Sequence, residues 1–172
     1  MLTTAYMHYK LTLVIEGERG NKRMIRVGVI GAGYIGRVHL EQLVRLGGVE
    51  VDTIVDSNIN LAKEAAQKYG VKNYSDNWKA VVDDPSIDVI HNCTPNKFHF
   101  EINKQALLNK KHILSEKPLA MTLEEAKELS ELPVKMDAGT GVDFCYRYYP
   151  VSIKRKQKTE WGYLHAQKNK EL

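Results

Sequence analysis

The chain has 172 residues, of which 43% are hydrophobic and 27% are charged, as in an ordinary globular protein with one sizeable core. No apolar run approaches the roughly 20 residues that span a bilayer, and the apolar stretch at residues 11–15 is too short for a secretory signal. The net charge of +4 is confined to the end of the chain, where six basic and two acidic residues follow position 150. We therefore expect a cytoplasmic protein without a membrane or nucleic-acid partner.

Strands and helices are predicted to alternate from residue 24 onward. The apolar run at residues 24–30 is typical of a buried parallel strand, and residues 34–46 carry apolar side chains close to helical spacing. A second strand is predicted at 49–55. Asp56, Ser57 and Asn58 then offer caps for a helix that runs to about residue 69 and ends at Gly70.

Strands and helices are predicted to alternate further along the chain, from residue 71 to residue 145. The further elements predicted are a short strand at 71–74, helical turns at 77–82, a strand at 87–92, a helix at 98–109, a strand at 112–115, a helix at 122–132 and a strand at 140–145. The helix at 122 starts with a capping box of Thr122 and Glu125 and is predicted to stop before Pro133. Such βαβ units predict an α/β fold with a Rossmann-type doubly wound parallel sheet.

Residues 1–23 precede the first predicted strand. Two interpretations of them stay open, an added edge strand at residues 10–15 or an extension without fixed structure, and we favour the second. The two cysteines, Cys93 and Cys145, have neither metal-ligand nor redox spacing, so we expect both to be buried and reduced. No metal site is predicted.

A Gly-x-Gly-x-x-Gly motif at residues 31–36 lies directly after the first strand and opens the first helix. In this context, Gly31 allows a tight turn, Gly33 lets the backbone approach a pyrophosphate, and Gly36 lets the helix pack closely on the strand. The first residues of the helix, Tyr34 and Ile35, present backbone N–H groups and the positive end of the helix dipole to the phosphates. The motif therefore predicts a dinucleotide site.

Asp56 lies 20 residues beyond Gly36, at the end of the second predicted strand. A carboxylate at this place accepts hydrogen bonds from ribose hydroxyls and repels a 2′-phosphate. No Arg or Lys follows it directly, so NAD is favoured over NADP as the cofactor. The alternative is that Asp56 only caps the following helix.

Two further loops follow strands and therefore face the same edge of a parallel sheet as the glycine motif. One contains Thr94, Pro95, Asn96 and His99, and the other begins with the pair at positions 116 and 117, a glutamate and a lysine. On composition alone, a turn proline and a solvated ion pair would explain them equally well.

Taken in order, these motifs resemble the Gfo/Idh/MocA family of oxidoreductases. The resemblance rests on Gly-x-Gly-x-x-Gly, Asp56, Cys-Thr-Pro-Asn-x-x-His at 93–99, Glu-Lys-Pro at 116–118, and Val-Asp-Phe-Cys-Tyr-Arg-Tyr-Tyr-Pro at 142–150. It runs continuously from residue 24 to about residue 150.

The resemblance implies roles for individual residues. Thr94, Pro95, Asn96 and His99 would line the cofactor near the bridge between its adenosine and nicotinamide halves. Glu116 would help to anchor the nicotinamide-side ribose. Lys117 would act as the catalytic residue between nicotinamide and substrate, and its bond to Pro118 is expected to be cis.

For the remaining candidates the resemblance leaves the roles open. Arg147 and Tyr149 match a segment that reaches the nicotinamide or substrate in the family, but packing at a domain boundary is an equally good interpretation. His39, on the first helix, is expected to be structural.

The family also implies how the chain is organised. We expect an N-terminal extension at 1–23, a dinucleotide-binding domain at 24–142 and, at 143–172, only the first segment of a second α/β domain for the substrate. The expected function is hydride transfer between NAD and a sugar or cyclitol, with weak or no turnover in this chain. The alternative is a non-enzymatic dinucleotide sensor. Apolar side chains at Ile153, Trp161 and Leu164 could drive self-association.

Overall fold

The computed structural model describes residues 24–144. Our expectations for the N-terminal extension, Cys145, Arg147, Tyr149 and the C-terminal apolar face fall outside the described residues. Within 24–144, no helix combines the length and the apolar character needed to cross a bilayer. The elements are β1 (Ile25–Ile30), α2 (Tyr34–Leu43), β2 (Val49–Val55), α3 (Ile59–Tyr69), β3 (Asn73–Ser75), α4 (Trp78–Asp83), β4 (Val89–Asn92), the 3-10 helix η1 (Asn96–Phe98), α5 (His99–Leu108), β5 (His112–Glu116), α6 (Leu123–Met136) and β6 (Thr140–Asp143).

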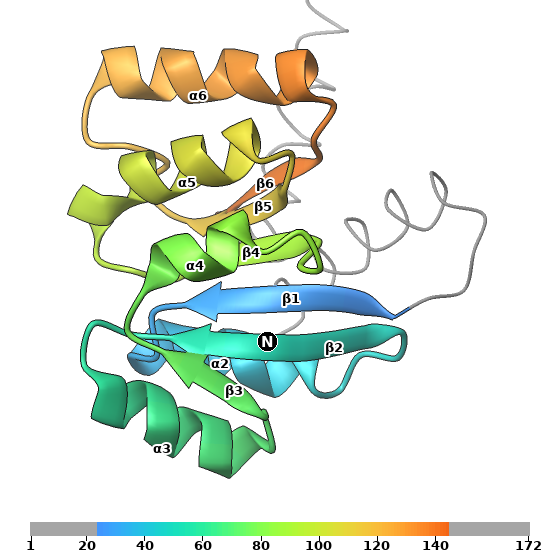
Figure 1. Cartoon of the computed structure of the whole chain (residues 1–172). Coiled ribbons are helices and arrows are strands. Elements are labelled where there is room, and N and C mark those ends of the chain that lie inside the picture. Colours follow the sequence, from blue (N-terminus) through green and yellow to red (C-terminus); the bar gives the residue numbers. More distant parts are fainter. Residues whose placement is uncertain (1–23, 145–172) are drawn as a thin grey trace, which may run out of the picture.

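The strands form one sheet in the order β3-β2-β1-β4-β5-β6, and every neighbouring pair is parallel. Figure 1 shows the strands with helices connecting them. All residues of β4 and β5 are buried, as expected for strands covered on both faces. The predicted Rossmann-type doubly wound sheet is thereby confirmed.

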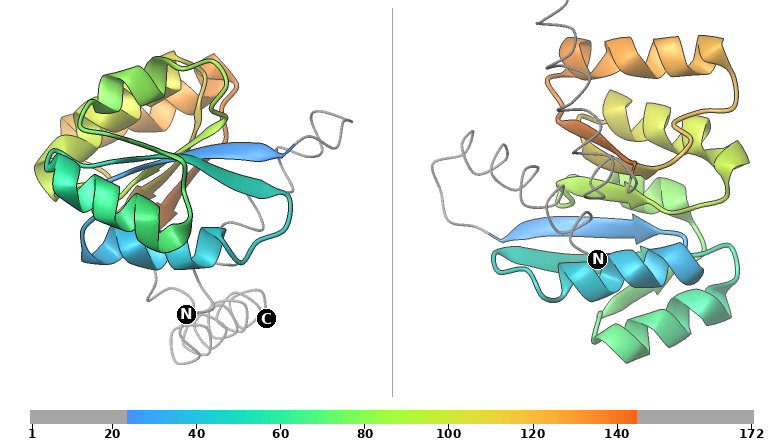
Figure 2. Two further views of the ribbon diagram at one scale, coloured as in Figure 1. Left: turned by 60° about the horizontal axis from the view of Figure 1, so that its bottom comes forward. Right: turned by 180° about the vertical axis from the view of Figure 1, so that it is seen from behind.

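Helices cover both faces of this sheet (Figure 2), and an apolar core lies between the sheet and each layer of helices. One face packs against α2 and α3 through Leu40, Leu43 and the alanines of α3. The other packs against α4, α5 and α6 through residues such as Val82, Ile102 and Leu129. Each helix thus buries one apolar stripe on the sheet, which keeps the strand ends at fixed positions.

The order of the strands reverses between β1 and β4. From β1 the chain proceeds outward through β2 and β3, and it then returns to pair β4 with the other side of β1. The loops that follow β1 and β4 consequently leave the sheet side by side, at its carboxyl edge. This switch point is where open α/β sheets bind their ligands.

The element boundaries differ from the sequence expectations at several points. Helix α6 continues through Pro133 to Met136 instead of stopping before the proline. A proline inside a helix removes one N–H, yet Leu129 and Leu132 anchor this helix on the core and outweigh the loss. The Pro133 carbonyl still accepts backbone hydrogen bonds from Asp137 and Ala138, which close the helix.

Other shifts are smaller. The first helix ends at Leu43 rather than at residue 46, and the short third strand lies at Asn73–Ser75 rather than at 71–74. A 3-10 turn at Asn96–Phe98 precedes α5, which begins at His99 rather than at residue 98. Such shifts of a few residues follow from local capping that hydrophobic spacing does not encode.

The capping box of α6 generates a prediction about stability. The Thr122 hydroxyl accepts a hydrogen bond from the Glu125 backbone N–H at 3.2 Å, and the Glu125 carboxylate accepts one from the Thr122 N–H at 3.2 Å. Thr122→Ala should lower the free energy of unfolding by about 1 kcal/mol, because it leaves a helix N–H unsatisfied. Urea denaturation measures this value.

The matched control is Lys127→Ala, an exposed position in the same helix. It should change the free energy of unfolding by no more than about 0.5 kcal/mol. Equal effects of the two substitutions would contradict a stabilising role for the cap.

Candidate dinucleotide site

The carboxyl ends of the central strands surround a cavity of about 600 Å³. It brings together seven of the predicted site residues, namely Gly31, Gly33, Tyr34, Ile35, Asp56, Thr94 and Pro95. Five other predicted site residues lie at or near the same edge of the sheet but do not line this cavity. They are Gly36, Asn96, His99, Glu116 and Lys117. Arg147 lies outside the described residues. The cavity therefore joins the glycine motif, Asp56 and the loop after β4 into one concave surface.

The glycine turn is held by close backbone contacts. Gly31 has a φ of +100°, and a Cβ there would lie 2.5 Å from the Cys93 carbonyl oxygen. A Cβ on Gly36 would lie 1.8 Å from the Gly31 carbonyl oxygen. Both positions exclude any larger residue without a backbone shift. The predicted tight turn and close helix packing are thus present in the structure.

The start of α2 is open toward the cavity. Gly33 is the N-cap, and among the described residues only its own chain neighbours can lie within 4 Å of where a Cβ would be. The first turn of α2 carries no acidic residue. The first N–H groups of a helix have no intrahelical partners, and the helix dipole favours an anion beside them. This geometry suits a phosphate group.

Asp56 lies on the same edge as the glycines and contacts their turn directly. Its Oδ2 atom accepts a hydrogen bond from the Ala32 backbone N–H at 2.8 Å, and its Oδ1 atom accepts one from the Asn58 N–H at 2.9 Å. The cap of α3 is Asn58, whose side chain accepts from the Asn60 N–H. The alternative that Asp56 only caps the helix is therefore wrong. Its carboxylate retains further lone pairs that can accept from ribose hydroxyls.

The cavity also has lining residues that sequence reasoning did not assign to the site, among them Asp76 and Trp78. Asp76 follows β3 just as Asp56 follows β2, so it adds a second carboxylate to the same edge. Trp78 begins α4 and supplies an aromatic ring to the wall. The position of Asp76 two residues after the strand predicted at 71–74 was a usable signal, because all parallel strands end on one side.

His99 does not line the cavity and instead contacts two loops. Its ring is fully buried, with Nδ1 2.6 Å from the Pro118 carbonyl oxygen and Nε2 2.7 Å from the Thr94 carbonyl oxygen. The imidazole thus connects the loop after β4 to the loop after β5. Its role at the cofactor stays a prediction, whereas its contacts show how the two loops are joined.

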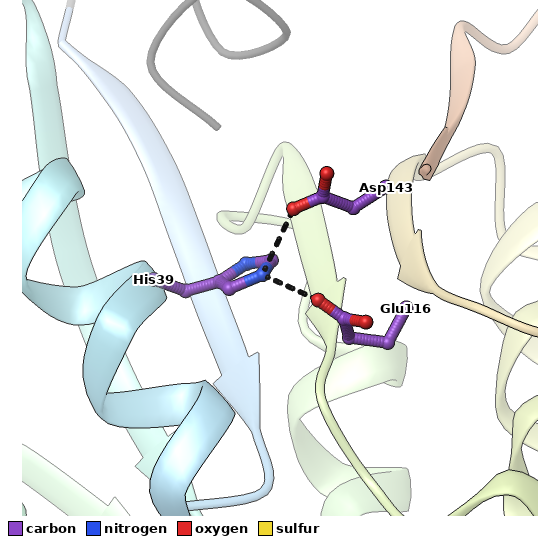
Figure 3. A group of neighbouring side chains, drawn as sticks. All are labelled: His39, Glu116 and Asp143. Carbon is purple, nitrogen blue, oxygen red and sulfur yellow. Dashed lines mark hydrogen bonds and ion pairs between the residues drawn. The ribbon is translucent and has the colours of Figure 1, made fainter. Parts of the chain in front are cut away.

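Lys117 is exposed at the end of β5, and its bond to Pro118 is cis, as expected. The preceding residue, Glu116, points into the protein. Its Oε1 atom lies 3.2 Å from Nε2 of His39, which is fully buried in α2 (Figure 3). Burial raises the pKa of Glu116, but the hydrogen bond and charge of His39 outweigh burial and hold this pKa below its usual value.

Comparisons with known proteins agree with this geometry. Residues 25–144 match the family model described as the Gfo/Idh/MocA oxidoreductase family with an NAD-binding Rossmann fold. The chain is 34% identical over 146 residues to levoglucosan dehydrogenase from Pseudarthrobacter phenanthrenivorans, covering 80% of this chain and 37% of that protein.

Two solved structures illustrate the likeness in three dimensions. Myo-inositol dehydrogenase from Lactobacillus casei, in complex with NAD(H) and myo-inositol, superposes with a TM-score of 0.71 at 30% identity, over 79% of this chain and 42% of that one. Biliverdin reductase from Synechocystis, in complex with biliverdin and NADP⁺, gives a TM-score of 0.73 at 26% identity, over 79% and 43%. The chain spans less than half the length of each of these three relatives.

The family model covers most of the chain, and the sheet order, the glycine turn and Asp56 occur together in the structure. The chain therefore belongs to the Gfo/Idh/MocA family of oxidoreductases, and residues 25–144 form its NAD-binding Rossmann fold.

Proposed function

We propose that this chain binds NAD and holds it for hydride exchange with a hydroxyl or carbonyl group of a sugar or cyclitol. The observation that carries the proposal is the 2.8 Å hydrogen bond from the Ala32 N–H to the Asp56 carboxylate. This bond holds the carboxylate that we assign to the ribose against the turn that would hold the pyrophosphate. Asp56 and the glycine turn both line one cavity, as the proposed dinucleotide site requires.

The charges around the cavity support NAD rather than NADP. Asp56 and Asp76 both line it, and no Lys or Arg among the described residues does. A 2′-phosphate would bring negative charge into a site that already holds two carboxylates, so its binding would be opposed. The ribose 2′-hydroxyl of NAD can instead donate to Asp56.

Trp78 and Phe98 add aromatic surface to the same cavity. Apolar and aromatic walls with a few placed polar groups are typical of cofactor sites. We assign the adenine ring to this part of the cavity. Thr94, Pro95 and Asn96 follow β4, which lies between β1 and β5 in the sheet, and we assign them to the bridge between the two halves of the cofactor.

Lys117 is the residue that we assign to the reaction. Bound NAD supplies the hydride acceptor, and the protein supplies position and electric field. An ammonium group beside the reacting oxygen stabilises negative charge that develops there. Lys117 is exposed at the carboxyl end of β5, two strands from β1 in the sheet, where such a contact is possible.

Proton transfer needs a second group within hydrogen-bond reach of the reacting oxygen. The described residues offer none beside Lys117, since Glu116 and Asp143 are buried and contact His39. We therefore propose that the chain by itself binds cofactor with weak or no turnover. The alternative is a non-enzymatic sensor of NAD, and the experiments below distinguish it from the proposed oxidoreductase.

The first prediction concerns cofactor affinity. Asp56→Asn keeps the shape of the side chain but removes its charge, so the Kd for NADH should rise about tenfold or more, which corresponds to about 1.4 kcal/mol. The Kd for NADPH should change much less, so that the preference for NADH narrows. Quenching or enhancement of NADH fluorescence gives both constants.

Glu131→Gln on α6 is the control, because Glu131 is exposed and does not line the cavity. It should leave both constants unchanged. Equal and negligible NADH binding by the wild-type chain and by Asp56→Asn would refute the proposed cofactor site.

The second prediction concerns catalysis. With NAD and myo-inositol, glucose or related polyols, NADH formation by the chain alone should stay close to the background rate. Lys117→Met should alter the Kd for NADH by no more than about threefold, since Lys117 does not line the cavity.

Initial rates at 340 nm measure the turnover. Robust NADH formation would contradict the need for a further proton-transferring group. NADH binding that stays intact without turnover, together with capture of a protein partner that depends on NAD, would favour the sensor.

A further inference from the structure

A cluster of three buried side chains lies between the first helix and the strand that leads to Lys117 (Figure 3). His39 comes from α2, Glu116 from the end of β5 and Asp143 from the end of β6. Nε2 of His39 lies 3.2 Å from Oε1 of Glu116 and 3.7 Å from Oδ2 of Asp143. The exposed fractions of the three residues are 0%, 7% and 4%.

The other side of the His39 ring also has a polar partner. Its Nδ1 atom lies 3.1 Å from Nδ1 of His91 on β4, and the two rings meet edge to face. An ionised carboxylate can only accept hydrogen bonds, so Nε2 of His39 donates to Glu116. A neutral imidazole donates from one nitrogen and accepts through the other. If His91 accepts, His39 donates from both nitrogens and is an imidazolium.

Charge balance favours that protonation state. Two buried carboxylates lie beside one ring, and removing ionised groups from water is costly unless an opposite charge is close. A positive His39 supplies this charge between Glu116 and Asp143. With a neutral His39, these two buried carboxylates would lose the positive charge that lies between them.

The cluster connects to the proposed reaction site through one carboxylate. Oε1 of Glu116 contacts His39, and Oε2 of the same group accepts a hydrogen bond from the Lys117 backbone N–H at 3.3 Å. His39 lies one helical turn after Gly36 on α2. The helix whose start faces the cavity is thus tied, through His39 and Glu116, to the backbone that carries Lys117.

We propose that His39 is a positioning residue of the reaction site: a buried imidazolium that holds the Glu116 carboxylate and so fixes the backbone of Lys117 relative to helix α2. Asp143 is the second carboxylate beside Nε2 of His39, at 3.7 Å, and joins β6 to the same ion cluster. The importance of His39 for hydride transfer rests on the proposed function of Lys117. The charge of His39 and its hold on Glu116 are testable without any cofactor.

The electrostatics around His39 agree with this assignment. Within residues 24–144, the titratable groups that face it include His91 from β4, Cys93 from the loop after β4, Glu116 from β5, and Asp143 from β6. Burial lowers the pKa of His39, but Cys93 and Glu116 outweigh burial and raise this pKa to about 10.

A raised pKa makes folding take up a proton. In the unfolded chain a histidine loses its proton near pH 6.5, so the stabilisation by His39 is complete below that value. It is lost progressively as the pH rises from there to about 10, the pKa in the folded protein. Between these limits, unfolding should release about one proton from His39. The unfolding equilibrium constant should therefore increase by nearly tenfold per pH unit because of this one group.

The decisive experiment compares this pH dependence in the full chain and in His39→Gln. Urea unfolding from pH 6.5 to 10 should show the steep dependence in the wild-type chain and its loss in His39→Gln. His112→Gln is the matched control. It is also a buried histidine, but its Nδ1 atom accepts a hydrogen bond from the Gly139 N–H, so that nitrogen carries no proton. The control should keep the wild-type dependence.

Positioning of Lys117 is read separately, by hydrogen exchange. In His39→Gln, the Lys117 amide should exchange at least about tenfold faster, while amides of the central strand β1 keep their wild-type protection relative to global unfolding. His112→Gln should leave the Lys117 amide unchanged. A uniform loss of protection would mean that His39 only stabilises the fold, and would overturn the positioning role.

A measurement on the wild-type chain covers the case in which His39→Gln does not fold. Both ring ¹⁵N resonances of His39 should have imidazolium positions at pH 8.5. Neutral-ring resonances, or one equivalent of a bound metal ion lost in Asp143→Asn, would overturn the inference. Failure of the proposed function would give a different result. NADH would then not bind, but the ¹⁵N resonances and the proton uptake of His39 would stay as predicted and would still support the imidazolium.

Discussion

The arrangement of this domain depends on one contact between two strand ends, in which the Asp56 carboxylate accepts a hydrogen bond from the backbone N–H of Ala32. The glycine turn follows β1 and the aspartate follows β2, so the contact requires the two strands to be parallel neighbours in a defined register. The two cores on opposite faces of the sheet hold this register. Without this register, the start of α2 and the Asp56 carboxylate would not face the same cavity.

Much of this could be predicted from sequence because the signals are local. The glycine spacing, the apolar strand β1 and the position of Asp56 each encode structure within one βαβ unit, and the pairing of neighbouring parallel strands then follows from chirality and connection length. The capping box of α6 is local as well. The end of α6 was missed because packing of Leu129 and Leu132 prevails over the local effect of Pro133.

The remaining features arise from contacts between distant segments. His39 and Glu116 are 77 positions apart, and nothing in the spacing of either residue indicates that α2 and the end of β5 meet. His39 was expected to be structural, which describes its burial but not the carboxylate that it contacts. Asp76 and Trp78 were missed for a related reason, since their place in the wall depends on where the short strand β3 ends.

The position of His99 has a consequence for motion in the domain. One imidazole ring lies within hydrogen-bond distance of a carbonyl oxygen in the loop after β4 and of another in the loop after β5. These two segments are therefore coupled and would shift together as one rigid piece. Any closure around a bound molecule that requires the rim to deform must then come from the side of β2 and β3, or from another part of the protein.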